Sequence, residues 1–181
     1  SDLICAPPAD MQITDLQLHP VQSRRQTGSV TPHVIVTLET REGITGLGEM
    51  SDVGDWGLMY DLADVKAAYE ALLVGQNPLD WHIITTSAQG RLRMGGAIQA
   101  GFEIALFDLI GKIQGRSVAG VFGGALKDKM RVCYPIFRNY SREDAEANIK
   151  RVDRRIGEGQ DLFRLYHGGV IEADEIFLDG V

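Results

Sequence analysis

The sequence predicts an α+β domain followed by a segment of parallel α/β structure. Two observations lead to this prediction. Up to residue 124, three segments of alternating apolar and polar residues precede three helical patterns, an order typical of α+β domains. After the glycine pair at 123–124 the order becomes strand, helix, strand, helix, which is typical of parallel sheets. We therefore expect a loose tail over residues 1–10, a first domain over 11–124 and a second over 125–181.

Three strands are expected in the first domain. Residues 11–22 alternate loosely between apolar and polar side chains, and residues 33–41 alternate cleanly, as strands with one buried face do. Glu42 and Gly43 then make a tight reversal into residues 44–49. The second and third strands are therefore predicted to form a β-hairpin.

Three helices are expected to follow these strands. Asp61 is placed to cap a helix that Gly75 ends, and a shorter helix is expected over residues 80–89. Residues 97–113 have the strongest helical period in the chain. The apolar stripe of this last helix predicts that it is largely buried, and its members are Ile98, Phe102, Ala105, Leu106, Leu109, Ile110 and Ile113.

The second domain is expected to begin with a buried strand over residues 132–137. Ser141 and Asp144 have the spacing of a capping box at the start of a helix. A second strand is expected within residues 161–169, and residues 171–181 begin another helical pattern. Two strands joined by a helix in this way are predicted to be parallel.

Composition limits the classes of partner. Of the 181 residues, 44% are hydrophobic and 24% are charged, as in ordinary globular proteins. The net charge of −7 argues against nucleic acid or an anionic membrane, since either needs a basic face. Cys5 and Cys133 match no metal-ligand spacing and are too few for a disulfide framework, so a cytoplasmic setting is the simplest interpretation. We expect neither a membrane span nor a signal peptide.

The strand within residues 161–169 carries the main candidate for chemistry. With a period of two, Arg164 and Tyr166 lie on one face, and Phe163 and Leu165 lie on the other. A guanidinium keeps its charge, and a cation beside a phenol favours the ionised phenol, so the pair is a candidate general base. The alternative is a structural tyrosine that is hydrogen-bonded to an arginine.

Two segments resemble the mandelate racemase and muconate lactonizing branch of the enolase superfamily. Residues 34–50, VIVTLETREGITGLGEM, resemble the hairpin of the family's N-terminal capping domain. Residues 97–124, AIQAGFEIALFDLIGKIQGRSVAGVFGG, resemble its signature helix, which includes Asp108 and Lys112. Asp108 and Lys112 are four residues apart and can form an ion pair. The resemblance implies an α+β capping domain over a (β/α) barrel of the TIM type, of which this chain would hold only the start.

The same resemblance implies a chemistry. Enzymes of this branch remove the proton α to a carboxylate and hold the resulting enolate with magnesium. Two lysines spaced by one residue usually end the second barrel strand, where this chain has Arg164 and Tyr166. This Arg-x-Tyr pattern is similar to that of a branch of acid-sugar dehydratases, including a galactarate dehydratase, in which a tyrosinate is the base. The resemblance therefore implies that Tyr166 is the base and that Arg164 supports it.

Such a base needs help from its surroundings. An ordinary tyrosine titrates near pH 10, so ionisation at pH 7 costs about 4 kcal/mol. One guanidinium commonly supplies about 1 to 3 of the three pH units, and a divalent cation is expected to supply the rest.

The magnesium ligands of the family are carboxylates on later barrel strands. A complete eight-unit barrel takes about 250 residues, whereas only two strand–helix units are expected here. We therefore expect this sequence to be a fragment of a longer enzyme, with the ligands beyond residue 181. Asp174 and Glu175 fall in the helix after the second strand, where we expect a solvated face.

Other residues are weaker candidates. Arg24 and Arg25 lie in the first capping-domain loop and could clamp a second carboxylate of the substrate, although a solvated basic pair is the alternative. His33 and His167 are expected to be structural. The remaining candidates for substrate contact, each weighed against local packing, are Trp56, Tyr60, Tyr134 and Arg138.

The leading functional hypothesis is a magnesium-dependent dehydratase that acts on a small-molecule acid sugar. A racemase, epimerase or cycloisomerase of the same branch is the enzymatic alternative. A non-catalytic fragment that serves as a binding or oligomerisation module is the alternative from another class. The family resemblance also suggests a homo-oligomer, and we expect no nucleic-acid or membrane partner.

Overall fold

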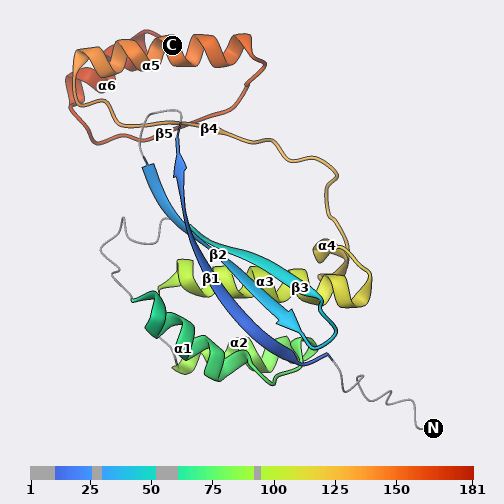
Figure 1. Ribbon diagram of the computed structural model, residues 1–181. Helices are drawn as coiled ribbons and strands as arrows, with labels where there is room; N and C mark the ends of the chain where they lie inside the picture. The colour runs from blue at the N-terminus through green and yellow to red at the C-terminus, as the bar shows by residue number, and fades with distance from the viewer. Residues whose placement is uncertain (1–10, 26–29, 52–60, 92–94) are drawn as a thin grey trace. The chain divides into compact units, whose positions relative to one another are not determined.

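The computed structural model describes residues 11–25, 30–51, 61–91 and 95–181. The chain divides into two compact units, Ser1–Ala125 and Leu126–Val181, which Figure 1 shows in blue to yellow and in orange to red. The first is an α+β unit and the second has parallel α/β structure, so the predicted fold class is confirmed.

The sheet of the first unit has three strands. They are β1 (Ile13–Arg24), β2 (Val30–Thr40) and β3 (Thr45–Ser51). They pair antiparallel in the order β1-β2-β3, so the three predicted strands and the predicted hairpin are confirmed. The first strand extends to Arg24, two residues beyond the predicted segment.

The helices of the first unit follow the sheet in sequence. They are α1 (Leu62–Leu73), the 3-10 helix η1 (Pro78–Asp80), α2 (Trp81–Arg91), α3 (Gly96–Gln114) and the short α4 (Val118–Val121). The carboxylate of the residue before α1 accepts a hydrogen bond from a first-turn amide, as predicted. The three predicted helices are therefore confirmed.

Helix α3 lies along the sheet and supplies much of the core (Figure 1). Its inner stripe is almost fully buried, as predicted, and Leu109 has no exposed surface. Gly48 on β3 allows this contact, because a Cβ at that position would lie 2.0 Å from the carbonyl oxygen of Gly101. The backbone of α3 therefore approaches the strand more closely than any larger residue would allow.

Asp108 and Lys112 of α3 bind the edge strand β3. The amide of Leu47 donates to Asp108 Oδ2 at 2.8 Å, and Lys112 Nζ donates to the carbonyl of Thr45 at 2.7 Å. Lys112 also pairs with Asp108, as predicted, at 2.8 Å. Because an edge strand leaves backbone groups without sheet partners, this pair satisfies two of those groups and fixes β3 on the helix.

The second unit has two strands and two helices. These are β4 (Tyr134–Ile136), α5 (Arg142–Gly157), β5 (Phe163–Leu165) and α6 (Ile171–Asp179). The strands are parallel, as predicted. Both helices pack on one face of the two strands, where a small core forms. Its fully or nearly fully buried members are Ile136, Ala145, Val152 and Phe177.

The prediction of a buried strand over residues 132–137 is only partly correct. The strand covers three residues, and Ile136 is its one buried side chain. Val132 is 74% exposed and Phe137 is 45% exposed. The helices cover one face of the strands, so Phe137, which follows Ile136, points away from the core. Val132 lies two residues before β4 begins.

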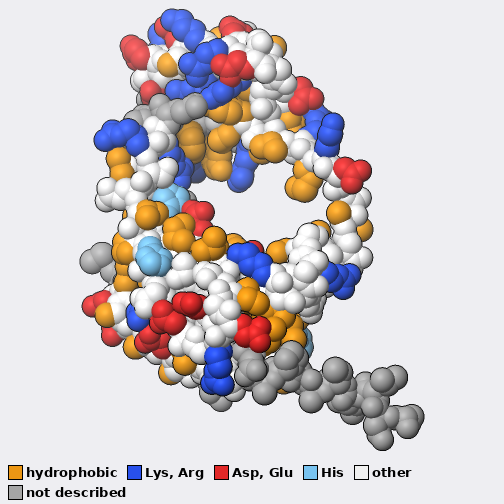
Figure 2. Space-filling view, turned by 45° about the vertical axis from the view of Figure 1, so that its right-hand side comes forward, with side chains coloured by type: hydrophobic (Ala, Val, Ile, Leu, Met, Phe, Trp, Pro, Cys, Tyr) orange, Lys and Arg blue, Asp and Glu red, His pale blue; other side chains and the backbone are white. Residues whose placement is uncertain are grey.

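Charges of both signs are interspersed over the face shown in Figure 2. This mixture agrees with the net charge of −7 for 18 basic and 25 acidic residues, and no extended basic face is visible there. In the part of the chain that the structure describes, none of the helices is long and apolar enough to cross a membrane.

Candidate active site

The strand β5 presents its side chains as the period-two pattern predicts. Phe163 and Leu165 pack against the small core beneath the helices. Arg164 and Tyr166 contact each other instead. The amide of Tyr166 donates to the carbonyl of Ile136 at 3.0 Å, so this residue is held at the carboxyl end of the strand pair. In parallel α/β structures, ligands bind at that end.

The phenol ring of Tyr166 has two side-chain neighbours of different chemistry. The guanidinium carbon of Arg164 lies over the ring, 4.7 Å from its centroid. The ring of Phe137 stacks with it at a centroid distance of 5.5 Å and an interplanar angle of 14°. The Arg164 contact is thus a cation–π contact.

The glycines after Tyr166 permit a close approach of two loops. A Cβ at Gly169 would lie 1.9 Å from the carbonyl oxygen of Asn139. That same oxygen accepts a hydrogen bond from the amide of Val170 at 2.8 Å. The segment after β5 is therefore in direct backbone contact with the segment after β4, and only glycine fits at the point of contact.

Asp174 does not lie on a solvated face, which corrects the prediction for this residue. Its side chain is 15% exposed and accepts a hydrogen bond from Asn139 Nδ2 at 2.9 Å. This hydrogen bond, with a smaller contribution from the amide of Gly168, holds the pKa of Asp174 below its ordinary value. Glu175 is exposed, as predicted. Asp174 differs because it lies in the first turn of α6, where a carboxylate can accept from the preceding loop.

Two buried asparagines were not singled out from the sequence. Asn139 and Asn148 are 3% and 4% exposed. Asn148 Nδ2 donates to Asn139 Oδ1 at 2.8 Å and to the carbonyl of Phe137 at 3.0 Å. A signal for Asn148 was present, because it stands three residues after the buried Ala145 on the inner side of α5. A polar residue on an apolar stripe is expected to have a specific partner.

The candidates for substrate contact in the second unit separate into two places. Tyr134 faces the helices, and the guanidinium carbon of Arg155 lies 4.4 Å from the centroid of its ring. It does not join Tyr166. Arg138 follows β4 and donates from Nε to the carbonyl of His167 at 2.9 Å. Arg138 therefore lies at the same end of the strands as Tyr166.

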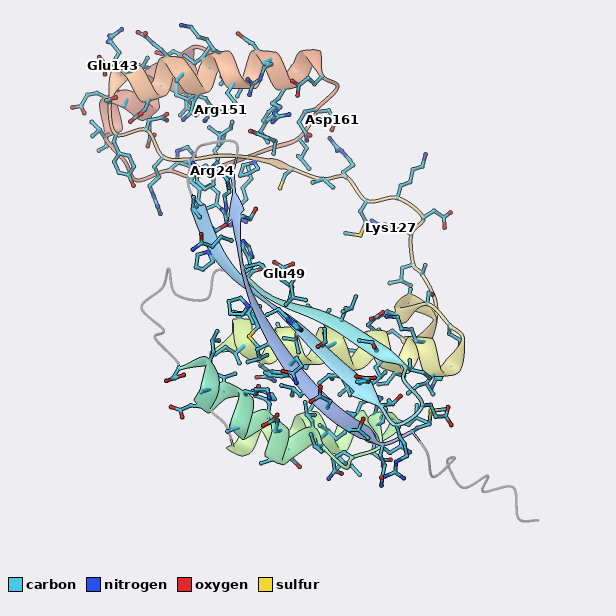
Figure 3. All side chains as sticks on the ribbon, viewed as in Figure 1. Arg24, Glu49, Lys127, Glu143, Arg151 and Asp161 are labelled. Carbon is cyan, nitrogen blue, oxygen red and sulfur yellow. The ribbon has the colours of Figure 1, made fainter. Side chains whose placement is uncertain are left out.

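Two candidates of the first unit, Arg24 and Arg25, lie at and just after the end of β1. Arg24 is the last residue of that strand (Figure 3), and Arg25 Nε donates to Thr31 Oγ1 at 3.4 Å. Both arginines are exposed. Trp56 and Tyr60 lie outside the described residues, and so do the loops that would contain them.

His33 has two polar neighbours in the first unit. Its Nδ1 lies 2.8 Å from Glu49 Oε1 and its Nε2 lies 2.9 Å from Thr31 Oγ1. Figure 3 shows Glu49 on β3, across the sheet from β2. The Glu49 contact links β2 to β3, whereas Thr31 lies on β2 itself, and both contacts fit a structural histidine.

Within the described ranges, no group of three or more histidine, cysteine, aspartate or glutamate side chains is placed to hold a metal ion. Asp174 is engaged with asparagine and backbone donors. The described residues therefore do not form a magnesium site.

Residues 10–123 match the family model described as mandelate racemase / muconate lactonizing enzyme, N-terminal domain. This match covers more than half of the chain, so the chain belongs to that family. The predicted family is confirmed, and it accounts for the three-stranded sheet packed on α3.

Curated relatives extend the similarity beyond this domain. A chloromuconate cycloisomerase from Cupriavidus pinatubonensis is 30% identical over 171 residues, which are 91% of this chain and 45% of the relative. A cis-3-hydroxy-L-proline dehydratase from Roseibium aggregatum is 30% identical over 143 residues, which are 77% of this chain and 38% of the relative. The chain thus spans less than half of the length of these relatives.

A solved structure shows the same fold. The mandelate racemase/muconate lactonizing family protein from Azoarcus sp. EbN1 matches with a TM-score of 0.78 and 20% sequence identity. The match covers 94% of this chain and 45% of that protein. The structural similarity therefore extends over both units of the chain. Named relatives comprise cycloisomerases, dehydratases and a racemase.

Proposed function

We propose that this chain supplies the capping domain and the general base of an enzyme that removes the proton α to the carboxylate of an acid sugar and then eliminates water. The observation that carries the proposal is the contact of the Arg164 guanidinium with the ring of Tyr166 at the carboxyl end of β5. It is supported by the family to which the chain belongs and by the dehydratases among its relatives.

In this proposal Tyr166 acts as the phenolate and takes the α-proton. The C–H electron pair becomes the enolate of the substrate carboxylate, and the charge passes from Tyr166 to the substrate. Arg164 stabilises the phenolate before the transfer. The β-hydroxyl then departs with the proton that Tyr166 has taken, so that water is lost and the resulting enol becomes a 2-keto acid. Proton transfer by a positioned side chain contributes about 10²- to 10⁴-fold to the rate.

Magnesium dependence is part of the same proposal and rests on the family resemblance. Because the described residues hold no metal site, the ligands would have to come from elsewhere than these residues. Removal of divalent ions with a chelator should abolish turnover, and Mg²⁺ should restore it. Turnover that is unaffected by the chelator would contradict this part of the proposal.

The first unit is proposed to bind the distal end of the substrate. Arg24 and Arg25, at and just after the end of β1, would pair with a second carboxylate, which favours a diacid sugar. Trp56 and Tyr60 are proposed to line the same side of the substrate, and a homo-oligomer is proposed as the assembly. Replacement of both arginines should raise KM for a diacid more than KM for a monoacid.

The test of the base is deuterium exchange at the substrate α-carbon in D₂O. Galactarate, glucarate and xylonate form a suitable panel, since the last two are named substrates of relatives. Tyr166→Phe should lower exchange by about 10²- to 10⁴-fold. Tyr140→Phe is the matched control, because Tyr140 belongs to the same unit and is 64% exposed. Exchange that survives Tyr166→Phe unchanged would remove Tyr166 as the base.

A second candidate function is favoured by one observation. The match to the chloromuconate cycloisomerase covers 91% of this chain, so a cycloisomerase or racemase of the same branch is the alternative. Exchange without loss of water would favour a racemase or epimerase, and conversion of a muconate would favour a cycloisomerase. Absence of exchange with every acid in the presence of Mg²⁺ would favour a binding or oligomerisation module.

A further inference from the structure

The ring of Phe137 is placed to hold Tyr166 and does little for the core. Phe137 is 45% exposed and lies on the side of the strands opposite the buried Ile136. A phenylalanine that serves packing alone is normally buried. Here the aromatic contact is with Tyr166, at 5.5 Å and nearly parallel. Offset stacking of this kind restricts the orientation of both rings.

The next two residues continue the same contact along the chain. Arg138 Nε donates to the carbonyl of His167 at 2.9 Å. The carbonyl of Asn139 accepts from the amide of Val170 at 2.8 Å. Three consecutive residues after β4 therefore contact the segment that follows β5, at Tyr166, His167 and Val170. Such a ladder of contacts fixes both loops at the carboxyl end of the strands.

The side chain of Asn139 anchors these contacts in the interior of the second unit. Asn139 Nδ2 donates to Asp174 on α6, and Asn139 Oδ1 accepts from Asn148 on α5. Asn148 also binds the carbonyl of Phe137 at 3.0 Å. The backbone of Phe137 is thereby tied to α5 at a site that is almost fully buried. Buried and fully hydrogen-bonded networks of this kind hold one arrangement of the backbone.

We infer that residues 137–139 form a brace that sets the orientation of the Tyr166 ring, with Phe137 as a positioning residue. This inference rests on the proposed function of Tyr166 as the base. A general base must lie within hydrogen-bond reach of the proton that it takes. The brace acts through Tyr166, because Phe137 aligns the ring and the buried asparagines fix the backbone of Phe137.

The test is NMR of the chain with ring-labelled tyrosine and phenylalanine, in which Tyr166→Phe assigns the Tyr166 signal. The unmodified protein should show a nuclear Overhauser effect between the rings of Phe137 and Tyr166. Phe137→Leu should shift the Tyr166 ring signal. Phe137→Tyr retains a stacking ring and should restore the original position of the Tyr166 signal.

Phe163→Leu is the matched control. It removes the same number of ring atoms from the same pair of strands, but on the face that packs against the helices, so the Tyr166 signal should stay unchanged. A Tyr166 signal that is the same in Phe137→Leu and in the unmodified protein would overturn the brace. If Phe137→Leu does not fold, the unmodified protein decides, because absence of the effect between the two rings overturns the inference.

In turnover, Phe137→Leu should lower kcat for exchange by about tenfold or more while KM changes little, since orientation and not binding is altered. The NMR result stands apart from turnover. Tyr166→Phe with full exchange would refute the base and leave the ring contact intact. An unchanged Tyr166 signal in Phe137→Leu would refute the brace and leave the base untouched.

Discussion

The two units of the chain are stabilised in different ways. In the described part of the first unit, sixteen buried apolar residues form one core between the sheet and the helices. The core of the second unit has four such residues, and next to it lies the buried network of Asn139 and Asn148. Apolar burial therefore dominates the first unit, whereas hydrogen bonds carry a larger share of the second.

This difference has a consequence for function. Apolar packing is not directional, so it holds a domain together without specifying the position of a single polar atom. Hydrogen bonds specify direction and distance. The second unit, which carries the proposed base, uses the interaction that can orient a side chain. The first unit, proposed to cover the substrate, needs only a rigid support for its loops.

The largest expected effect is the loss of a core side chain from the first unit. Leu109→Ala removes a fully buried side chain from the centre of α3. Its cost combines lost burial with a cavity, about 2 to 5 kcal/mol in the free energy of unfolding. Ile104→Ala on the same helix is the control, because Ile104 is 51% exposed. Chemical denaturation measures both, and equal losses would contradict the assignment of the core.

Removal of one asparagine should cost the second unit less than Leu109→Ala costs the first. Asn139→Ala removes one of the two acceptors of Asn148 Nδ2 and takes the amide donor away from Asp174. A buried polar group that loses its partner costs about 1 to 3 kcal/mol. Amide hydrogen exchange should show faster opening of α5 and α6 with little change in α3. Unchanged exchange in α5 and α6 would show that the network contributes no stability.

The sequence predicts the first unit better than the second for the same physical reason. Apolar periodicity reports burial against a neighbouring element, and it placed β1, β2, β3 and the long helix α3 correctly. It also placed Arg164 and Tyr166 on one face of β5. It could not show that Asp108 and Lys112 bind the edge strand β3, because those contacts join residues more than 60 positions apart.

The same limit applies to the candidate site. Nothing in the spacing of Phe137 and Tyr166 predicts their stacking, which depends on the register of two parallel strands. The sequence alone predicts a solvated face at Asp174, because helical period cannot show a loop that folds back onto the first turn. Long-range hydrogen bonds leave no period in a sequence, so only the structure reveals them.

The smallest expected effects are opposite responses of the two units to pH. Burial, with a smaller contribution from Glu103, raises the pKa of Tyr69 in the first unit to about 12. The unfolded chain, with a tyrosine pKa of 10.0, loses this proton first. The stabilisation by Tyr69 is therefore complete below pH 10 and is lost as the pH rises toward 12. Tyr69→Phe should reduce this loss of stability at alkaline pH, which is measured through the unfolding of α1 and α3.

Asp174 gives the second unit the reverse dependence. Its pKa lies below the ordinary value of 3.8, chiefly because Asn139 donates to the carboxylate. The unfolded chain therefore binds the proton first as the pH falls. The stabilisation is present above pH 3.8 and is lost as the pH falls through the lower folded value. Asp174→Asn should reduce the loss of stability of α5 and α6 at acid pH. It should leave the loss of stability of α1 and α3 at alkaline pH unchanged. If Tyr69→Phe and Asp174→Asn each altered the acid and the alkaline loss of stability equally, the two units would share one unfolding transition. The contrast between an apolar unit and a hydrogen-bonded unit would then fail.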